Sequence, residues 1–181
     1  MTHLAKHFLS KLRSLRKRED GNATIEFAIM FPILITMFLS SVEIGILTIR
    51  QVMLERAVDL TVRDLRLGHF VNPTQNALRT LICQRAAVVP GCMDSLLIEL
   101  RPVSTTTWAP LASDTTCKNR DEPINPAVTL NPGIAHEMVL VRVCSVFQPV
   151  FPTTTLGISL KKDSVGGYAL VTSSAFVNEP S

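Results

Sequence analysis

Hydrophobic and polar positions divide the chain into a polar start, a long apolar run and a mixed remainder. Residues 1–20 are polar and basic, and the apolar run begins directly after Gly21. The twenty residues 23–42 include ten Ile, Leu, Phe or Val and a single ionisable side chain, Glu26. Twenty residues are about what a helix needs to cross the hydrocarbon core of a bilayer. The pattern therefore predicts a transmembrane helix over residues 22–49.

Glu26 carries a charge that hydrocarbon penalises by about 2.5–3.5 kcal/mol at the centre of a bilayer. On the same scale the large apolar residues contribute roughly −3 to −6 kcal/mol toward insertion. The segment is therefore expected to insert despite Glu26. Six Lys or Arg residues precede it, and the positive-inside rule then places the N-terminus in the cytoplasm and the rest of the chain outside.

The helical pattern continues beyond the apolar run. Residues 50–67 continue the helix, and over residues 43–67 one amphipathic stripe of side chains repeats at spacings of three and four. Its members are Ile44, Leu47, Gln51, Leu54, Val58, Thr61 and Leu65. The stripe predicts one helix from Asn22 to about Leu67, whose second half packs on the chain's own globular part. Pro32 is expected to kink this helix, and Gly68 is expected to end it.

Residues 68–181 contain shorter elements and predict an extracytoplasmic α+β domain. Thr74 can cap a short helix over residues 75–87. Alternating patterns predict three strands, over residues 95–102, 136–147 and 168–177. The expected fold class is α+β, with a long N-terminal helix, a second short helix and a small antiparallel sheet of about three strands.

Four cysteines lie after the apolar run, on the side predicted to be outside: Cys83, Cys92, Cys117 and Cys144. An even number in an exported domain favours disulfides. The paired spacing of a structural zinc site is missing from the sequence. Three connectivities are open. We favour Cys83–Cys92 with Cys117–Cys144, because the first pair closes a short local loop.

The net charge of +3 arises from the first 21 residues, which hold six Lys/Arg and two Asp/Glu. The remainder holds twelve Lys/Arg and thirteen Asp/Glu, so no nucleic-acid partner is expected. His136-Glu137 begins like a zinc-protease motif, but position 140 is Leu. A catalytic dyad of Cys117 or Cys144 with His136 is the remaining alternative, and a structural cystine is favoured over it. The sequence thus predicts neither an enzyme nor a cofactor or metal site.

The start of the apolar run resembles a known processing signal. A basic leader, Gly21, four residues and Glu26 are similar to a type IV prepilin, which an inner-membrane aspartyl peptidase cuts directly after the glycine. More narrowly, EDGNATIEFAIMFPILI resembles the TadE-like family, the pseudopilins of tight-adherence (Flp) pilus systems. The family pattern A-x-x-E-[FY]-A is followed by a proline, and here Phe27 stands where many members have Tyr. Pro32 matches the proline.

The C-terminal half carries a second, independent resemblance. The segments MVLVRVCSVF and SSAFVNEPS are similar to family members, with Ser181 in place of the usual terminal aromatic residue. The arrangement of Cys83 and Cys92 around a short loop is also similar. A disulfide-stapled, pilin-like fold is what the resemblance implies.

The resemblance further implies cleavage between Gly21 and Asn22, so that residues 1–21 are a cytoplasmic leader. Glu26 becomes the fifth residue of the mature chain, where it would pair with an α-amine, its own or a neighbouring subunit's. Glu26 and Phe27 are thus implied to serve peptidase recognition and assembly.

The function implied is that of a minor pilin or pseudopilin required for assembly of a tight-adherence (Flp, type IVc) pilus. Implied partners are a prepilin peptidase, other pilins or pseudopilins, the pilus assembly platform and the bacterial inner membrane. The protein would cross that membrane once, with its domain in the periplasm, and either stay there or join the pilus. The alternative is an unprocessed single-pass membrane protein with a periplasmic binding domain.

Overall fold

The computed structural model describes residues 22–70, 72–107, 117, 128–154, 158–160, 162 and 167–179. The predictions for Gly21 and for the leader lie outside these residues. The described part contains one long helix, one short helix, a further helical turn and a three-stranded antiparallel sheet. The predicted α+β class is therefore confirmed.

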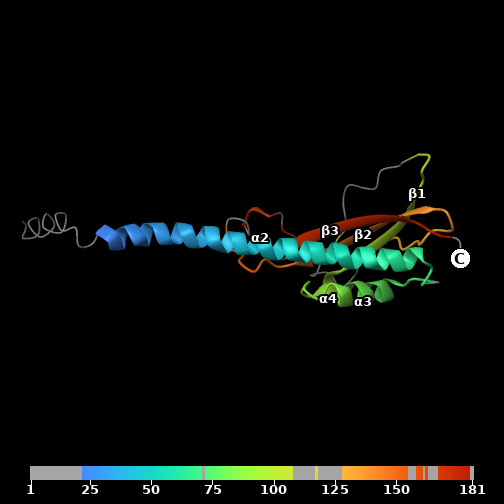
Figure 1. The fold of residues 1–181 in the computed structure, drawn as a ribbon, viewed down its shortest axis with the longest axis horizontal. Helices are drawn as coiled ribbons and strands as arrows, with labels where there is room; N and C mark the ends of the chain where they lie inside the picture. Colours follow the sequence, from blue (N-terminus) through green and yellow to red (C-terminus); the bar gives the residue numbers. More distant parts are fainter. Residues whose placement is uncertain are drawn as a thin grey trace, which may run out of the picture.

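Helix α2, over Asn22–Arg66, is 45 residues long, or about 68 Å at 1.5 Å per residue. It continues through Pro32, and the other elements lie beside its C-terminal half (Figure 1). The helix ends at Arg66, and Gly68, the predicted stop signal, follows two residues later with a φ of 70°. Gly68 N–H donates to the carbonyl oxygen of Leu65, and His69 N–H donates to that of Asp64. This pair of bonds satisfies carbonyls that a helix end otherwise leaves unpaired.

Helix α3 extends over Gln75–Arg85, and its predicted cap is confirmed, because the Thr74 hydroxyl accepts a hydrogen bond from Ala77 N–H. It ends before residue 87, the predicted end. A helical turn that the sequence did not predict, α4 over Cys92–Ser95, follows. Ser95 was predicted to begin the first strand. That prediction is wrong, because Ser95 N–H completes the helical turn by donating to the carbonyl oxygen of Gly91.

The sheet has the order β1–β2–β3, and both neighbouring pairs are antiparallel. Its strands are β1 over Leu97–Val103, β2 over Met138–Phe147 and β3 over Tyr168–Val177. The predicted third strand agrees in both bounds. The second begins later than predicted, because His136 has a φ of 69° and lies in a turn. Pro102 lies in β1, an edge strand, where its missing N–H is tolerated.

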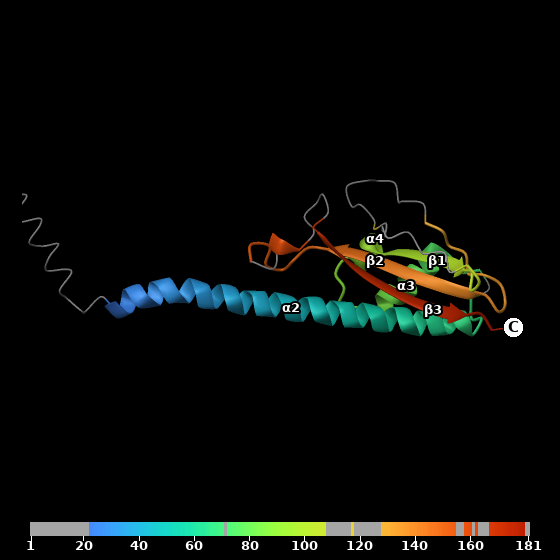
Figure 2. The ribbon, with the colours of Figure 1, turned by 90° about the horizontal axis from the view of Figure 1, so that it is seen from above.

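The core lies between one face of the sheet and the helices α2 and α3. Helix α2 lies along β3, and α3 lies nearer β1 (Figure 2). Leu54, Val58, Thr61 and Leu65 of the predicted stripe are buried, so the predicted packing of the helix on its own domain is confirmed. Ile44 is an exception at 51% exposure.

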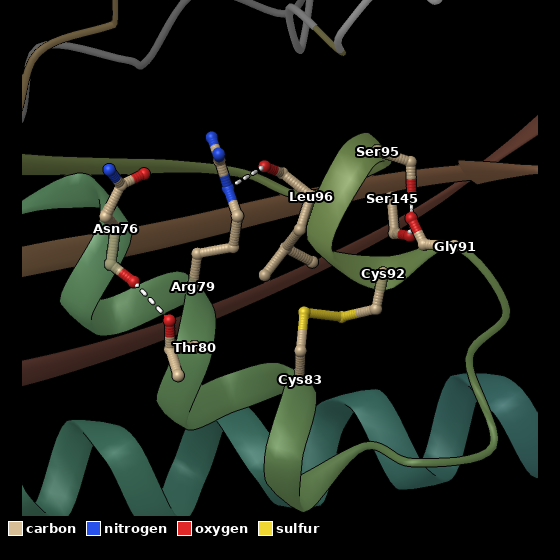
Figure 3. The surroundings of a disulfide bond; sticks show 9 residues. All are labelled: Asn76, Arg79, Thr80, Cys83, Gly91, Cys92, Ser95, Leu96 and Ser145. Carbon is tan, nitrogen blue, oxygen red and sulfur yellow. Dashed lines mark hydrogen bonds between the residues drawn. A yellow bond between two sulfur atoms is a disulfide. The ribbon is translucent and has the colours of Figure 1, made fainter.

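Two disulfides link the segments around this core, with the pairing that the sequence favoured. Cys83–Cys92 joins the end of α3 to α4 (Figure 3). Close to this bridge, Arg79 Nε donates to the carbonyl oxygen of Leu96 at 3.1 Å. Cys117–Cys144 fastens a distant loop residue to β2. Both predicted disulfides of the domain are therefore present.

Candidate assembly segment and its junction with the domain

The first third of α2 is apolar on every side. All side chains from residue 23 to 38 are exposed. The large apolar ones among them are Ile25, Phe27, Ile29, Met30, Phe31, Ile33, Leu34, Ile35, Met37 and Phe38. In the described part of the chain, α2 is the one helix long and apolar enough to cross a membrane, judged by length and composition. A helix that is apolar all round normally lies inside a protein or a membrane, and no described element covers this one.

Three hydroxyl groups at the C-terminal end of this segment and just beyond it are compatible with hydrocarbon. Thr36 Oγ1 donates to the carbonyl oxygen of Ile33 at 2.9 Å. Ser40 and Ser41 donate in the same way to carbonyl oxygens one turn earlier, at 2.8 and 3.0 Å. Because each of these O–H groups is satisfied within the helix, none needs water.

Glu26 is the polar exception on this surface. Its side chain is exposed and has no hydrogen-bond or ion-pair partner among the described residues. Next to it, the 64% exposed ring of Phe27 stacks on that of Phe31, with centroids 5.1 Å apart. Asn22 is the first residue of α2, and its side chain and Gly21 lie outside the description. A carboxylate on an apolar, uncovered helix thus remains available for a partner from outside the described residues.

Glu43, the other acidic residue of the apolar region, has the opposite environment. Its side chain is fully buried, at 0% exposure. One carboxylate oxygen accepts from Val150 N–H at 3.0 Å and the other from Phe151 N–H at 2.9 Å. The hydroxyl of Tyr168 donates to the first oxygen at 3.3 Å. Glu43 therefore ties α2 to the β2–β3 connection and to the start of β3.

The tyrosine that donates to this carboxylate packs against a second aromatic ring. The ring of Tyr168 packs edge-on against that of Phe147, with centroids 4.5 Å apart. The guanidinium of Arg50 lies over the Phe147 ring at 4.8 Å, a cation–π contact. Burial, together with the negative charge of Glu43, raises the pKa of Tyr168 to about 12. The phenol therefore stays protonated and remains a donor to Glu43.

Sequence reasoning missed the role of Glu43. The available signal was a second carboxylate inside an otherwise apolar region. Its partners, however, are backbone N–H groups 107 and 108 residues away. No local pattern reports such a contact.

The first two residues of the family-like ending NEPS, Asn178 and Glu179, make contacts within the domain. The side-chain amide of Asn178 donates to the carbonyl oxygens of Pro132 and Ile134, at 2.6 and 3.2 Å. Glu179 forms an ion pair with Arg66 at 2.8 Å. Asn178 thus fastens the chain after β3 to the loop before β2, and Glu179 fastens it to the last turn of α2.

The alternative catalytic dyad of Cys117 or Cys144 with His136 needs a free thiol, and both of these cysteines are in a disulfide. Cys117 and Cys144 form a disulfide, so neither presents a thiolate beside His136, which is exposed. Among the described residues no group of three or more His, Cys, Asp or Glu side chains is placed to hold a metal ion. The proposed nucleophile of the dyad is therefore unavailable for chemistry in this state.

These features define a class of protein: a small disulfide-linked α+β domain carried on the end of a long helix, whose other end could span a membrane. The family model of TadE-like protein matches residues 21–63, which confirms the resemblance over that segment. No curated protein and no solved structure matches the chain significantly.

Proposed function

We propose that the protein is a minor pilin or pseudopilin that acts in assembly of a tight-adherence pilus, after a prepilin peptidase removes residues 1–21. The observation that carries this proposal is Glu26, an unpartnered carboxylate on an uncovered apolar helix whose sequence matches the TadE-like family. In hydrocarbon such a charge is costly unless it is paired. A helix with this feature is suited to meeting another subunit.

Cleavage after Gly21 would create the missing partner. The new α-amine at Asn22 lies four residues before Glu26, a rise of about 6 Å along a helix. The amine of the same chain, or that of a neighbouring subunit, can therefore approach the carboxylate. Pairing the two charges offsets part of the penalty that each would suffer alone in the membrane.

The remaining features fit the same assignment. Basic residues before the helix favour an N-terminus in the cytoplasm and a periplasmic domain. Ala23 and Ala28 flank Glu26 and would let another pilin helix approach closely. In this role the chain is a substrate of the peptidase and a part of the assembly, with no cofactor and no catalytic residue of its own.

The first prediction concerns Glu26→Ala. The variant should still insert and still lose its leader, but pilus assembly should fall sharply. Leaving one partner of a buried ion pair alone costs about 3–5 kcal/mol, enough to weaken subunit association more than a hundredfold. Pili sheared from cells measure assembly, and membrane fractionation measures insertion.

A matched control is Glu55→Ala, which removes an exposed carboxylate from the same helix outside the apolar segment. It should assemble normally. Normal pilus yield in Glu26→Ala as well would remove this account of the carboxylate.

A further inference from the structure

The connection between β2 and β3 has an unusual composition for an exposed loop. The first thirteen of its twenty residues, 148–160 (QPVFPTTTLGISL), contain no ionisable side chain, and Lys161, Lys162 and Asp163 follow them. Among those that the structure describes, Val150 is 45% exposed and Ile158 is 68% exposed. Water-facing loops normally carry charges, so this composition points to a surface that meets something apolar.

Glu43 fixes the height of this loop along α2. It is the first residue after the apolar window 23–42, whose twenty residues span about 30 Å, the thickness of a bilayer core. Because Glu43 binds the N–H groups of Val150 and Phe151, these two residues lie at the level where the core would end. The described part of the connection lies beside α2, at the end of the sheet that faces the apolar half of the helix (Figure 2).

Ile158 lies close to the same level. Thr154 N–H donates to the carbonyl oxygen of Phe151, and Ile158 N–H donates to that of Thr154. Leu160 lines an apolar groove of about 420 Å³ together with Leu47 and other residues of α2. Since Leu47 is four residues beyond Glu43, or about 6 Å, residues 158–160 lie within the depth of the headgroup region, roughly 5–7 Å on each side of the core.

Exposure alone does not identify this surface. Ile134, 71% exposed, lies at the opposite end of the sheet, where Asn178 binds its carbonyl oxygen. What distinguishes residues 148–160 is that they contain no ionisable side chain and that their described part lies next to the exposed apolar helix (Figure 2). Ile44, 51% exposed on α2, extends the same apolar surface across the junction.

We propose that residues 148–154 and 158–160 form a second membrane contact, which rests in the interfacial layer of the leaflet facing the domain. Glu43 acts as the positioning residue that holds this contact against α2. The loop would thereby set the distance of the domain from the bilayer and its orientation about the helix. This inference rests on the membrane anchor of the proposed function.

The test uses tryptophan as a depth probe in the full chain. The single tryptophan, Trp108, is first replaced by phenylalanine. One new tryptophan is then introduced at a time into this Trp108→Phe protein. Ile158→Trp probes the loop, Ile134→Trp is the matched control at the distal end, and Phe38→Trp, at a 62% exposed position, reports on the span. Each protein is reconstituted in phosphatidylcholine vesicles whose acyl chains carry bromine near the headgroup.

We expect brominated lipid to quench the fluorescence of Ile158→Trp and Phe38→Trp, and to leave that of Ile134→Trp unchanged. Quenching of Phe38→Trp with no quenching of Ile158→Trp would overturn the loop contact and leave the anchor intact. A lack of quenching in all three would overturn the anchor and the loop contact together. Val150→Trp repeats the test at a second exposed position, should Ile158→Trp fail to fold.

Discussion

Two carboxylates on one helix differ in what surrounds them. Glu26 lies on an uncovered apolar surface with no partner among the described residues, whereas Glu43 is fully buried and accepts three hydrogen bonds. A buried carboxylate with satisfied oxygens is a structural group. The Glu26 carboxylate, by contrast, is free to pair with a group from outside the described residues. The function proposed above follows from this difference.

A second prediction tests the structural role of Glu43. Glu43→Ala leaves the N–H groups of Val150 and Phe151 and the hydroxyl of Tyr168 without their acceptor. An unsatisfied buried group costs about 1–3 kcal/mol, so the free energy of unfolding should fall by at least that much. Urea unfolding of the protein in detergent measures it, with Glu55→Ala as the exposed control. Equal stability of the two variants would contradict the role given to Glu43.

The third prediction concerns Tyr168, the single tyrosine of the chain. Its pKa is raised from 10.0 to about 12, by burial first and by Glu43 second. Because the protonated phenol is favoured in the folded state, this contribution to stability is complete below pH 10 and is lost as the pH rises toward 12. Ultraviolet absorbance of the phenolate gives the pKa directly.

In Glu43→Gln the pKa of Tyr168 should move part of the way back toward 10, since burial remains. Circular dichroism at each pH verifies that the domain is folded during the titration. A phenol that titrates near pH 10 in the folded wild-type protein would contradict the contact.

At the scale of elements, periodicity predicted most of the fold. The long helix and the third strand follow from patterns that persist over ten or more residues. The short turn α4 escaped prediction, because four residues carry no period. The stripe predicted that Ile44 would be buried, but its neighbour Glu43 is buried instead. Backbone N–H groups of a distant loop donate hydrogen bonds to the Glu43 carboxylate and so allow its burial. Sequence patterns report burial faces well and long-range polar contacts poorly.

A fourth prediction concerns the two disulfides. Replacing both cysteines of either pair by serine should lower the free energy of unfolding by about 2–4 kcal/mol. The loss should be larger for Cys117–Cys144, because its sequence separation is 27 against 9 for Cys83–Cys92 and the longer loop gains more freedom when unfolded. Urea unfolding measures both variants. An equal or reversed order would indicate that native-state contacts, and not loop length, dominate.

At the scale of the whole molecule, one helix serves two purposes. Its C-terminal half is the inner wall of the domain, and its N-terminal half extends beyond the domain as an apolar rod (Figure 1). Glu43 marks the junction. A rigid connection of this kind would transmit the position of the membrane segment to the domain, which suits a subunit that must pack by its helix and present its domain outside.

The central proposal is that the mature chain begins at Asn22, after removal of residues 1–21. The most direct measurement is the intact mass of the protein extracted from membranes of cells that contain the prepilin peptidase. The account predicts a chain that starts at Asn22, and a chain that retains residues 1–21 when Gly21→Leu is introduced or the peptidase is deleted. An unprocessed N-terminus in peptidase-containing cells would contradict it.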